Sequence, residues 1–343
     1  MPETVARPVL APGSDRATDG SARWRGLVRW EAALVVLLAA VLVFGAAHST
    51  SFLDPTNFFY VALNMGEIAI MALPLMFVVM TGDIDLSVAS MLGLSGTVMG
   101  SLFHAGWSVW AAMAAALVVG LLGGALNGVL VAKLGLPSIA VTIGTLTLFR
   151  GIAEVVLAPQ TITGFPLSLS TVGVTPIPHT QLSWSIGIFF LLAVVAGVVL
   201  HLSPLGRAIV AIGLQREAAT FAGIRVDRIR FGLFVLSGLL CSFAGILFTL
   251  KNSSVSYDAG TGLELTVVAV VLLGGVSIFG GRGTVLGVVL SVAIVGCLQQ
   301  ALTQRAIQAE VQNIVTGTLL LVSVVVPNSG AALRRFRART RRD

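Results

Sequence analysis

Three acidic residues have the clearest potential for chemistry in this sequence. Asp83 and Asp85 lie two residues apart in the stretch GDIDLSVASMLGLSG, residues 82–96, and Glu67 precedes them within an apolar run. Such carboxylates can carry protons, or they can accept hydrogen bonds from a polar substrate. Asp85 or Ser87 can instead cap the helix that follows, but capping explains neither Glu67 nor Asp83.

The composition of the chain places these carboxylates in a membrane. Of 343 residues, 56% are hydrophobic and 10% are charged, and the mean hydropathy is +0.97. A soluble domain needs a larger polar surface to cover its core. A charge at the centre of a bilayer costs about 2.5–3.5 kcal/mol on insertion scales. We therefore expect the carboxylates to face the interior of a helix bundle or a water-filled cavity.

Apolar segments long enough to span a bilayer recur along the chain. About 20 apolar residues suffice for one crossing as a helix. The sequence predicts an all-α polytopic membrane protein with about ten transmembrane helices in one bundle. The predicted spans cover residues 32–47, 58–81, 86–103, 107–132, 137–157, 184–202, 231–250, 263–279, 284–302 and 311–327.

The distribution of charge predicts the topology of this bundle. An even number of spans leaves both termini on one side of the membrane. Basic residues gather before the first span, within residues 207–230 and in the tail RRFRARTRRD, and basic clusters that flank apolar helices mark the cytoplasmic side. Both termini are therefore predicted to be cytoplasmic, with Lys251 and Arg305 outside as a modest exception.

The chain divides into three predicted regions. Residues 1–30 form a disordered basic N-terminal segment in the cytoplasm, residues 31–327 the transmembrane domain, and residues 328–343 a basic cytoplasmic tail. Residues 207–230 form a cytoplasmic loop within the domain. The glycines at 120, 124 and 128 recur every fourth residue, which predicts close helix packing.

Several kinds of site are not predicted. Cys241 and Cys297 lie in apolar runs, so no disulfide framework is indicated. The four histidines lie far apart without the spacing of metal ligands, and neither a metal nor a cofactor is predicted. The stretch GGVSIFGGRGT lacks the lysine and the serine or threonine of a phosphate-binding loop.

Four stretches resemble one known family. GDIDLSVASMLGLSG resembles the GGIDLSVGS-type signature of the sugar-type permeases of ABC importers, a family that includes ribose, xylose and arabinose permeases. Residues 136–152, 205–231 and 260–287 resemble three further segments of this family, and the likeness covers residues from about 52 to 327. The overall pattern resembles rhamnose and autoinducer-2 permeases most. Asp83 departs from the pattern, which usually has glycine there.

The resemblance implies a function for the chain and a set of partners. It implies the transmembrane subunit of an ATP-driven importer for a small carbohydrate, such as rhamnose or an autoinducer-2-like sugar derivative. The partners would be a cytoplasmic ABC ATPase, a second copy of this permease or a related one, and an extracytoplasmic sugar-binding protein. The location would be the bacterial inner membrane, surrounded by lipid. The chain itself would be no enzyme, because ATP would be hydrolysed on a partner.

Two groups of residues carry these expectations. The hypothesis for coupling to the ATPase rests on a short helix between Gly213 and Gly223, whose Glu217, Ala218, Ala219 and Gly223 match the family's loop. The coupling residues are Arg216, Glu217, Ala218, Ala219 and Gly223. The candidates for the substrate pathway are Glu67, Asp83, Asp85, Ser87, Asn127, Thr142, Thr145, Arg150 and Glu154, with Asn64 as a further amide. Arg150 and Glu154 are four residues apart, which predicts a pair on one helix face.

The sequence is also compatible with two other classes of protein. In a proton- or ion-coupled secondary transporter, Glu67, Asp83 and Asp85 would carry protons. A polytopic membrane enzyme would use the same carboxylates as acid and base. That class is disfavoured because no extramembrane constellation of His, Asp or Lys accompanies them.

Overall fold

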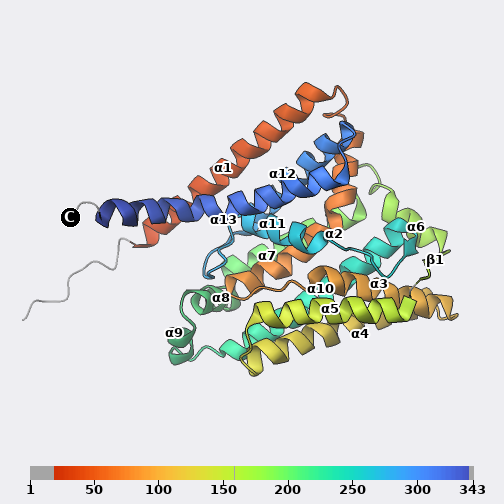
Figure 1. The fold of residues 1–343 in the computed structure, drawn as a ribbon, viewed down its shortest axis with the longest axis horizontal. Coiled ribbons are helices and arrows are strands. Elements are labelled where there is room, and N and C mark those ends of the chain that lie inside the picture. The colour runs from red at the N-terminus through yellow and green to blue at the C-terminus, as the bar shows by residue number, and fades with distance from the viewer. Residues whose placement is uncertain (1–18, 158, 340–343) are drawn as a thin grey trace, which may run out of the picture.

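A computed structural model describes the backbone of residues 19–157 and 159–339, with side chains for residues 30–157, 159–323 and 325. Helices make up most of this part of the chain (Figure 1). The helices are α1 (Asp19–His48), α2 (Pro55–Met80), α3 (Val88–His104), α4 (Val109–Gly128), the π-helical turn η1 (Val129–Lys133), α5 (Ser138–Leu157), α6 (Leu167–Val174), α7 (Trp184–Leu202), α8 (Pro204–Leu214), α9 (Arg216–Phe221), α10 (Val226–Asn252), α11 (Leu263–Leu273), α12 (Val285–Gln304) and α13 (Ala309–Arg339). Two short strands, β1 (Ile162–Thr163) and β2 (Ser254–Val255), pair antiparallel with Ile162 opposite Val255.

Each of the ten predicted spans falls on a helix. Seven helices of the described chain are long and apolar enough to cross a membrane: Trp30–His48 within α1, then α2, α4 with η1, α5, α7, α10 and α12. α3 has 17 residues and α11 has 11, so they are shorter than a full crossing, and the last predicted span lies in α13. The polytopic helical class is confirmed, whereas the count of ten crossings stays a prediction.

Several helix ends differ from the sequence prediction. α1 begins at Asp19, ahead of the first predicted span at residue 32. No proline lies between Pro12 and Pro55 to stop a helix from extending ahead of the apolar run. The eighth span was predicted to reach residue 279, but α11 ends at Leu273, where Gly274 and the positive-φ Gly275 follow. Residues 1–18 and 340–343 of the two predicted terminal segments lie outside the described chain.

α10 is the central helix of the bundle and packs against α2, α3 and α4. The predicted glycine face of α4 is confirmed at this contact. A Cβ at Gly124 would collide with the Phe234 carbonyl of α10, and one at Gly120 with Ser242. Gly128 faces Phe231 in the same way. These glycines therefore let the two helix backbones approach closely.

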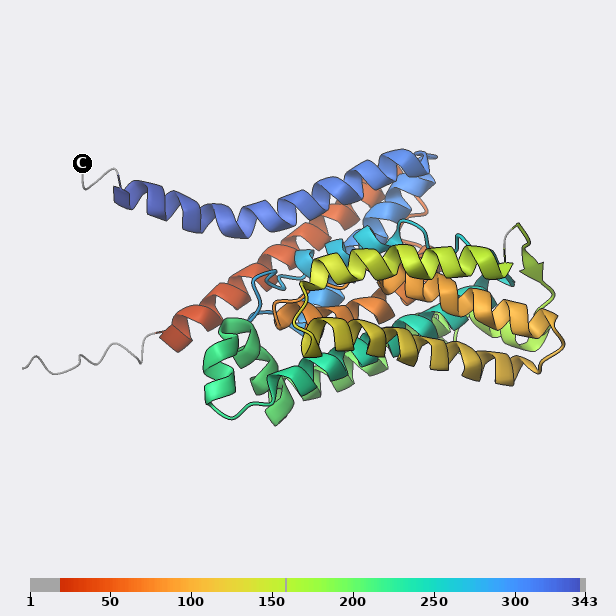
Figure 2. The ribbon, with the colours of Figure 1, turned by 60° about the horizontal axis from the view of Figure 1, so that its bottom comes forward.

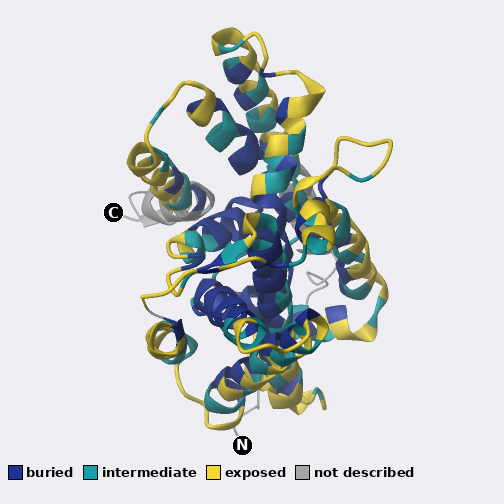
Figure 3. Cartoon of the chain, turned by 90° about the vertical axis from the view of Figure 1, so that its right-hand side faces the viewer, coloured by how far each residue is buried: buried dark blue, intermediate teal, exposed yellow. Residues whose placement is uncertain are grey.

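The two ends of the bundle carry different elements. α1 begins and α13 ends on one side, where α8 and α9 also lie, and both long helices extend past the bundle there (Figures 1 and 2). β1 and α6 lie at the opposite end (Figure 1). Buried residues gather in the middle of the molecule (Figure 3), and α2 is enclosed so fully that every residue from 65 to 80 is buried.

Candidate functional site

A non-helical break between α2 and α3 holds the two predicted aspartates. α2 ends at Met80, and Gly82 follows with φ +81°, a conformation that glycine adopts without strain. Residues 83–87 then continue without helical structure until α3 begins at Val88. Asp83 and Asp85 are both buried in this break, at 3% and 2% exposure. Buried carboxylates need partners, so their contacts decide what each one does.

Asp83 is held by two arginines. Arg230, in the first turns of α10, donates from Nε to Oδ2 at 2.7 Å and from Nη2 to Oδ1 at 2.9 Å. Arg216, the first residue of α9, donates from Nη2 to the same Oδ1 at 2.8 Å and to the Thr81 carbonyl at 3.2 Å. Asp83 therefore joins the break to both α9 and α10.

Asp85 accepts hydrogen bonds from uncharged amide and hydroxyl groups. Its Oδ1 accepts from the Ser87 amide at 3.0 Å and from the Ser87 hydroxyl at 2.6 Å. Its Oδ2 accepts from Ser237 of α10 at 3.0 Å, and Asn127 of α4 donates to the Ser87 hydroxyl at 2.9 Å. The carboxylate binds the Ser87 amide just ahead of α3 and ties this point to α10. Neither Asp85 nor Ser87 accepts from the first amides of α3, so the capping interpretation is wrong.

The start of α5 lies against the same break. Ser138 accepts from the Ile84 amide at 3.2 Å, and Thr142 donates to the Ile84 carbonyl at 3.2 Å. Thr145, one turn further, donates to the Thr142 carbonyl at 3.4 Å. The structure thus brings Asp83, Asp85, Ser87, Asn127 and Thr142 together around one break, with Thr145 close by on the same helix.

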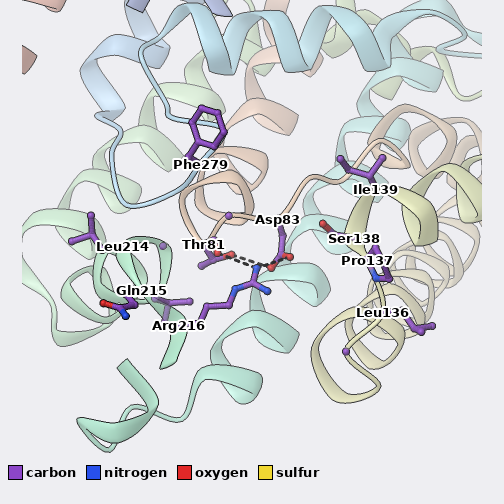
Figure 4. A pocket seen from close by; sticks show the side chains of 14 residues that line it. Thr81, Asp83, Leu136, Pro137, Ser138, Ile139, Leu214, Gln215, Arg216 and Phe279 are labelled. Carbon is purple, nitrogen blue, oxygen red and sulfur yellow. Dashed lines mark hydrogen bonds and ion pairs between the residues drawn. The ribbon is translucent and has the colours of Figure 1, made fainter. Parts of the chain in front are cut away.

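An open cavity of about 460 Å³ adjoins the break at the end of the molecule that carries α8 and α9 (Figure 4). Its walls come from the break, the loop between η1 and α5, the junction of α8 and α9, and Phe279. Asp83 and Arg216 lie side by side in its wall (Figure 4). A smaller cavity of about 140 Å³, between α2, α12 and α13, is lined by Asn64 and several glutamines.

Glu67 lies apart from the break and has its own partner. Its Oε2 accepts from Lys251 Nζ at 2.7 Å, with the two side chains only 2% and 11% exposed. Ser185 of α7 also donates to Glu67 at 3.4 Å. Lys251 was one of the two basic residues that violated the predicted topology, and this pairing neutralises it inside the protein.

The predicted pair between Arg150 and Glu154 is wrong. No ion pair joins them, and Glu154 is exposed while Arg150 Nη1 donates to the Ala259 carbonyl. The spacing brings their Cβ atoms near one another, but the long arginine side chain reaches an inward carbonyl instead. Arg150 Nη2 and Glu264 Oε2 are both buried without a hydrogen-bond partner among the described residues.

The predicted coupling residues lie in a folded segment. Arg216 binds Asp83, Glu217 and Ala218 are exposed, Ala219 is buried, and Gly223 ends the turn after α9 with φ +81°. Ile212, Ala219 and Val226 form a separate small apolar cluster that joins α8, α9 and α10. The segment is thus a compact unit with its own core.

Sequence reasoning missed several residues of this region. Phe221, at the end of α9, is 91% exposed, and an aromatic residue within the charged stretch REAATFAG was the available signal. Arg230, Ser237 and Lys251 were not assigned as partners of the carboxylates, because nothing local links residues more than 140 positions apart. Among the described residues, no group of His, Cys, Asp or Glu could hold a metal ion.

Comparison with known proteins identifies the family. The family model described as the branched-chain amino acid transport system / permease component matches residues 57–324. The ribose import permease protein RbsC of Escherichia coli (strain K12) is 35% identical over 301 residues, 86% of this chain and 92% of that protein. The autoinducer 2 import system permease protein LsrD of Klebsiella pneumoniae is 33% identical over 310 residues, 87% of this chain and 91% of that protein.

A second autoinducer-2 protein extends this likeness. The permease protein LsrC of Salmonella choleraesuis is 32% identical over 292 residues, 85% of this chain and 83% of that protein. No solved structure gives a significant match. The family resemblance seen in the four motifs is thereby confirmed. The chain belongs to the sugar ABC importer permease family, together with the ribose and autoinducer-2 import permeases.

Proposed function

We propose that this chain is the membrane-spanning subunit of an importer for a small sugar or sugar derivative in the bacterial inner membrane. A separate ATPase subunit powers the importer. Ribose, an autoinducer-2-like compound and rhamnose are the substrates to test first. Two of the relatives carry the first two compounds in their names, and the likeness of the motifs suggested the third. The chain supplies the pathway, and hydrolysis takes place on its partner.

The observation that carries this proposal is the folded projection formed by α8 and α9. It lies at the end of the bundle where α1 begins and α13 ends (Figure 1). A small apolar cluster packs α9 against α8 and α10, while Phe221 is 91% exposed. An exposed aromatic residue is a typical anchor for a protein partner, because aromatic side chains are enriched in the cores of interfaces. The projection therefore offers an ATPase a firm surface to push.

A second permease is expected along α5. This helix exposes six large apolar side chains along its length, and a Cβ at Gly144 or Gly151 would meet no atom within 4 Å. Glu154 is exposed on the same helix, and a carboxylate facing lipid is costly. A second permease would cover this helix and leave a polar passage between the subunits for the carboxylate.

Mass spectrometry of the chain purified gently from native membranes tests the proposal. We expect a stoichiometric ATP-binding cassette subunit in the complex. Phe221→Ala should reduce the amount of that subunit by about ten-fold or more, because a buried aromatic anchor contributes about 2 kcal/mol or more. Phe279→Ala is the matched control, since Phe279 is 78% exposed at the same end but lies between α11 and α12.

Uptake into proteoliposomes decides between the energy sources. Uptake of radiolabelled ribose, rhamnose or autoinducer-2 should require ATP and survive collapse of the proton gradient. Uptake that needs the gradient and no ATPase would overturn the proposal in favour of a secondary transporter. That alternative needs carboxylates that take up and release protons. Glu67 and Asp83 are held in ion pairs, so Asp85, whose hydrogen-bond donors Ser87 and Ser237 are uncharged, would be its main candidate.

A further inference from the structure

We propose that Asp83 is a positioning residue that passes movement of α9 to the break between α2 and α3, through its contact with Arg216. The inference rests on the proposed function, because the movement of α9 would come from a docked ATPase. In this role Asp83 transmits force and does not bind substrate.

The two arginines that share Asp83 differ in exposure. The Arg230 side chain is 7% exposed, whereas that of Arg216 is 42% exposed. If Arg216 withdraws, its guanidinium is hydrated and Asp83 keeps both oxygens bonded to Arg230. No buried charge is then left unpaired, which is the expensive outcome for a buried ion pair. The contact with Arg216 can therefore break and form again, while the contact with Arg230 persists.

Arg216 also makes the hydrogen bonds that join α9 to the membrane bundle. Among the described residues, the other hydrogen bonds of α9 stay within residues 215–224. Gln215 separates α8 from α9 in an extended conformation, with φ −163° and ψ 105°. α9 is thus a separate helix from α8, and a tilt of α9 would move Arg216, its first residue, which binds Asp83 directly.

Backbone contacts anchor α8, which precedes Gln215, to the bundle. The end of α8 packs so closely that a Cβ at Gly213 would collide with the Met80 carbonyl and the Gly281 amide. The Gly281 amide donates to the Met80 carbonyl at 2.8 Å. Backbone packing therefore joins α8, α2 and the loop before α12. α9 meets them through Arg216 and the small cluster of Ile212, Ala219 and Val226, and it is the part that we propose to move.

The break distributes this movement to three helices. Asp83 is two residues from Asp85, which binds Ser237 of α10 and, through Ser87, Asn127 of α4. Ile84 binds Ser138 and Thr142 of α5. A displacement of Asp83 therefore reaches α4, α5 and α10 beside the open cavity.

The test measures whether nucleotide on the ATPase changes the break. Ile84→Cys places a half-buried thiol next to Asp83, while the native Cys241 and Cys297 are buried. The complex that contains this variant and its ATPase is reconstituted in liposomes. The rate of reaction with N-ethylmaleimide is measured with and without ATP and vanadate. We expect nucleotide to change the rate by about five-fold or more, the lower range of coupling between sites.

Arg216→Gln in the same background should reduce this nucleotide effect to less than about two-fold, while Arg216→Lys should retain part of it. Arg228→Gln, which removes an exposed arginine without an ion pair in the described chain, is the matched control. A nucleotide effect that is absent from the parent, or unchanged in Arg216→Gln, would overturn the inference. Failure of the ATPase to co-purify would instead refute the proposed function, and the role of Asp83 with it.

Discussion

The ion pair between Glu67 and Lys251 gives a prediction whose size follows from burial. Lys251→Met leaves Glu67 without its cation in the middle of α2, with the carboxylate side chain 2% exposed. Removing one partner of a buried pair costs about 3–5 kcal/mol, because the remaining charge is uncompensated. Glu67 cannot reach water from this position, so we expect the full loss in this variant.

The opposite substitution should cost less. Glu67→Met leaves Lys251, which is 11% exposed, lies in the last turn of α10 and sits 5.4 Å from the Phe248 ring. A lysine at a helix end can extend its ammonium toward water along its aliphatic stem. The double variant removes both charges, and replacing a buried pair by apolar groups is often neutral or stabilising.

Thermal unfolding in detergent, followed with a thiol-reactive dye, measures these differences. Cys241 and Cys297 are buried, so they react with the dye when the bundle opens. We expect Lys251→Met to lower Tm by about 5–15 °C, Glu67→Met to lower it less, and the double variant to fall near the parent. A Tm of Lys251→Met equal to that of the parent would show that the pair is not buried as described.

Two further predictions concern the break and the helix packing. Asp85→Ala should reduce uptake and lower Tm, because it leaves the hydroxyls of Ser87 and Ser237 without their acceptor, at about 1–3 kcal/mol for each buried group. Asp85→Asn should reduce uptake and Tm less. Normal uptake at normal expression in Asp85→Ala would show that the contacts of Asp85 are dispensable. Gly124→Ala should destabilise the protein because its Cβ would collide with the Phe234 carbonyl. Gly197→Ala, on α7 in open space, should stabilise it by about 1 kcal/mol. Equal Tm shifts in one direction would contradict the packing described for α4.

The positions of the helices along the chain could be predicted from local features of the sequence, but some helix ends could not. Apolar runs separated by glycine, proline and charge located all ten segments, because each helix must satisfy its own backbone in lipid. The predicted seventh span began at residue 231, whereas α10 begins at Val226. The charged stretch RVDRIR looked like a loop, yet Arg230 is buried against Asp83 and belongs to the helix. Hydropathy cannot recognise a buried charge whose partner lies 147 residues away.

The failure of the Arg150–Glu154 prediction has a related cause. A spacing of four residues places two side chains on neighbouring positions of one helix, but it does not say what else lies within their reach. Arg150 faces inward and finds the Ala259 carbonyl 109 residues away, while Glu154 turns outward. Long-range acceptors of this kind follow from the packing of whole helices, which local spacing does not determine.

The three acidic residues Glu67, Asp83 and Asp85 all have a partner on the same helix, α10. Glu67 binds Lys251, Asp83 binds Arg230, and Asp85 binds Ser237, and all three partners lie on α10. Charges are expensive in the membrane, so their strongest use here is to fix α10 at both ends and at its middle against α2 and the break. A neutral sugar would then meet hydroxyl, amide and backbone groups rather than these acids. Weak contacts of that kind suit a conduit, because a pathway must release what it admits.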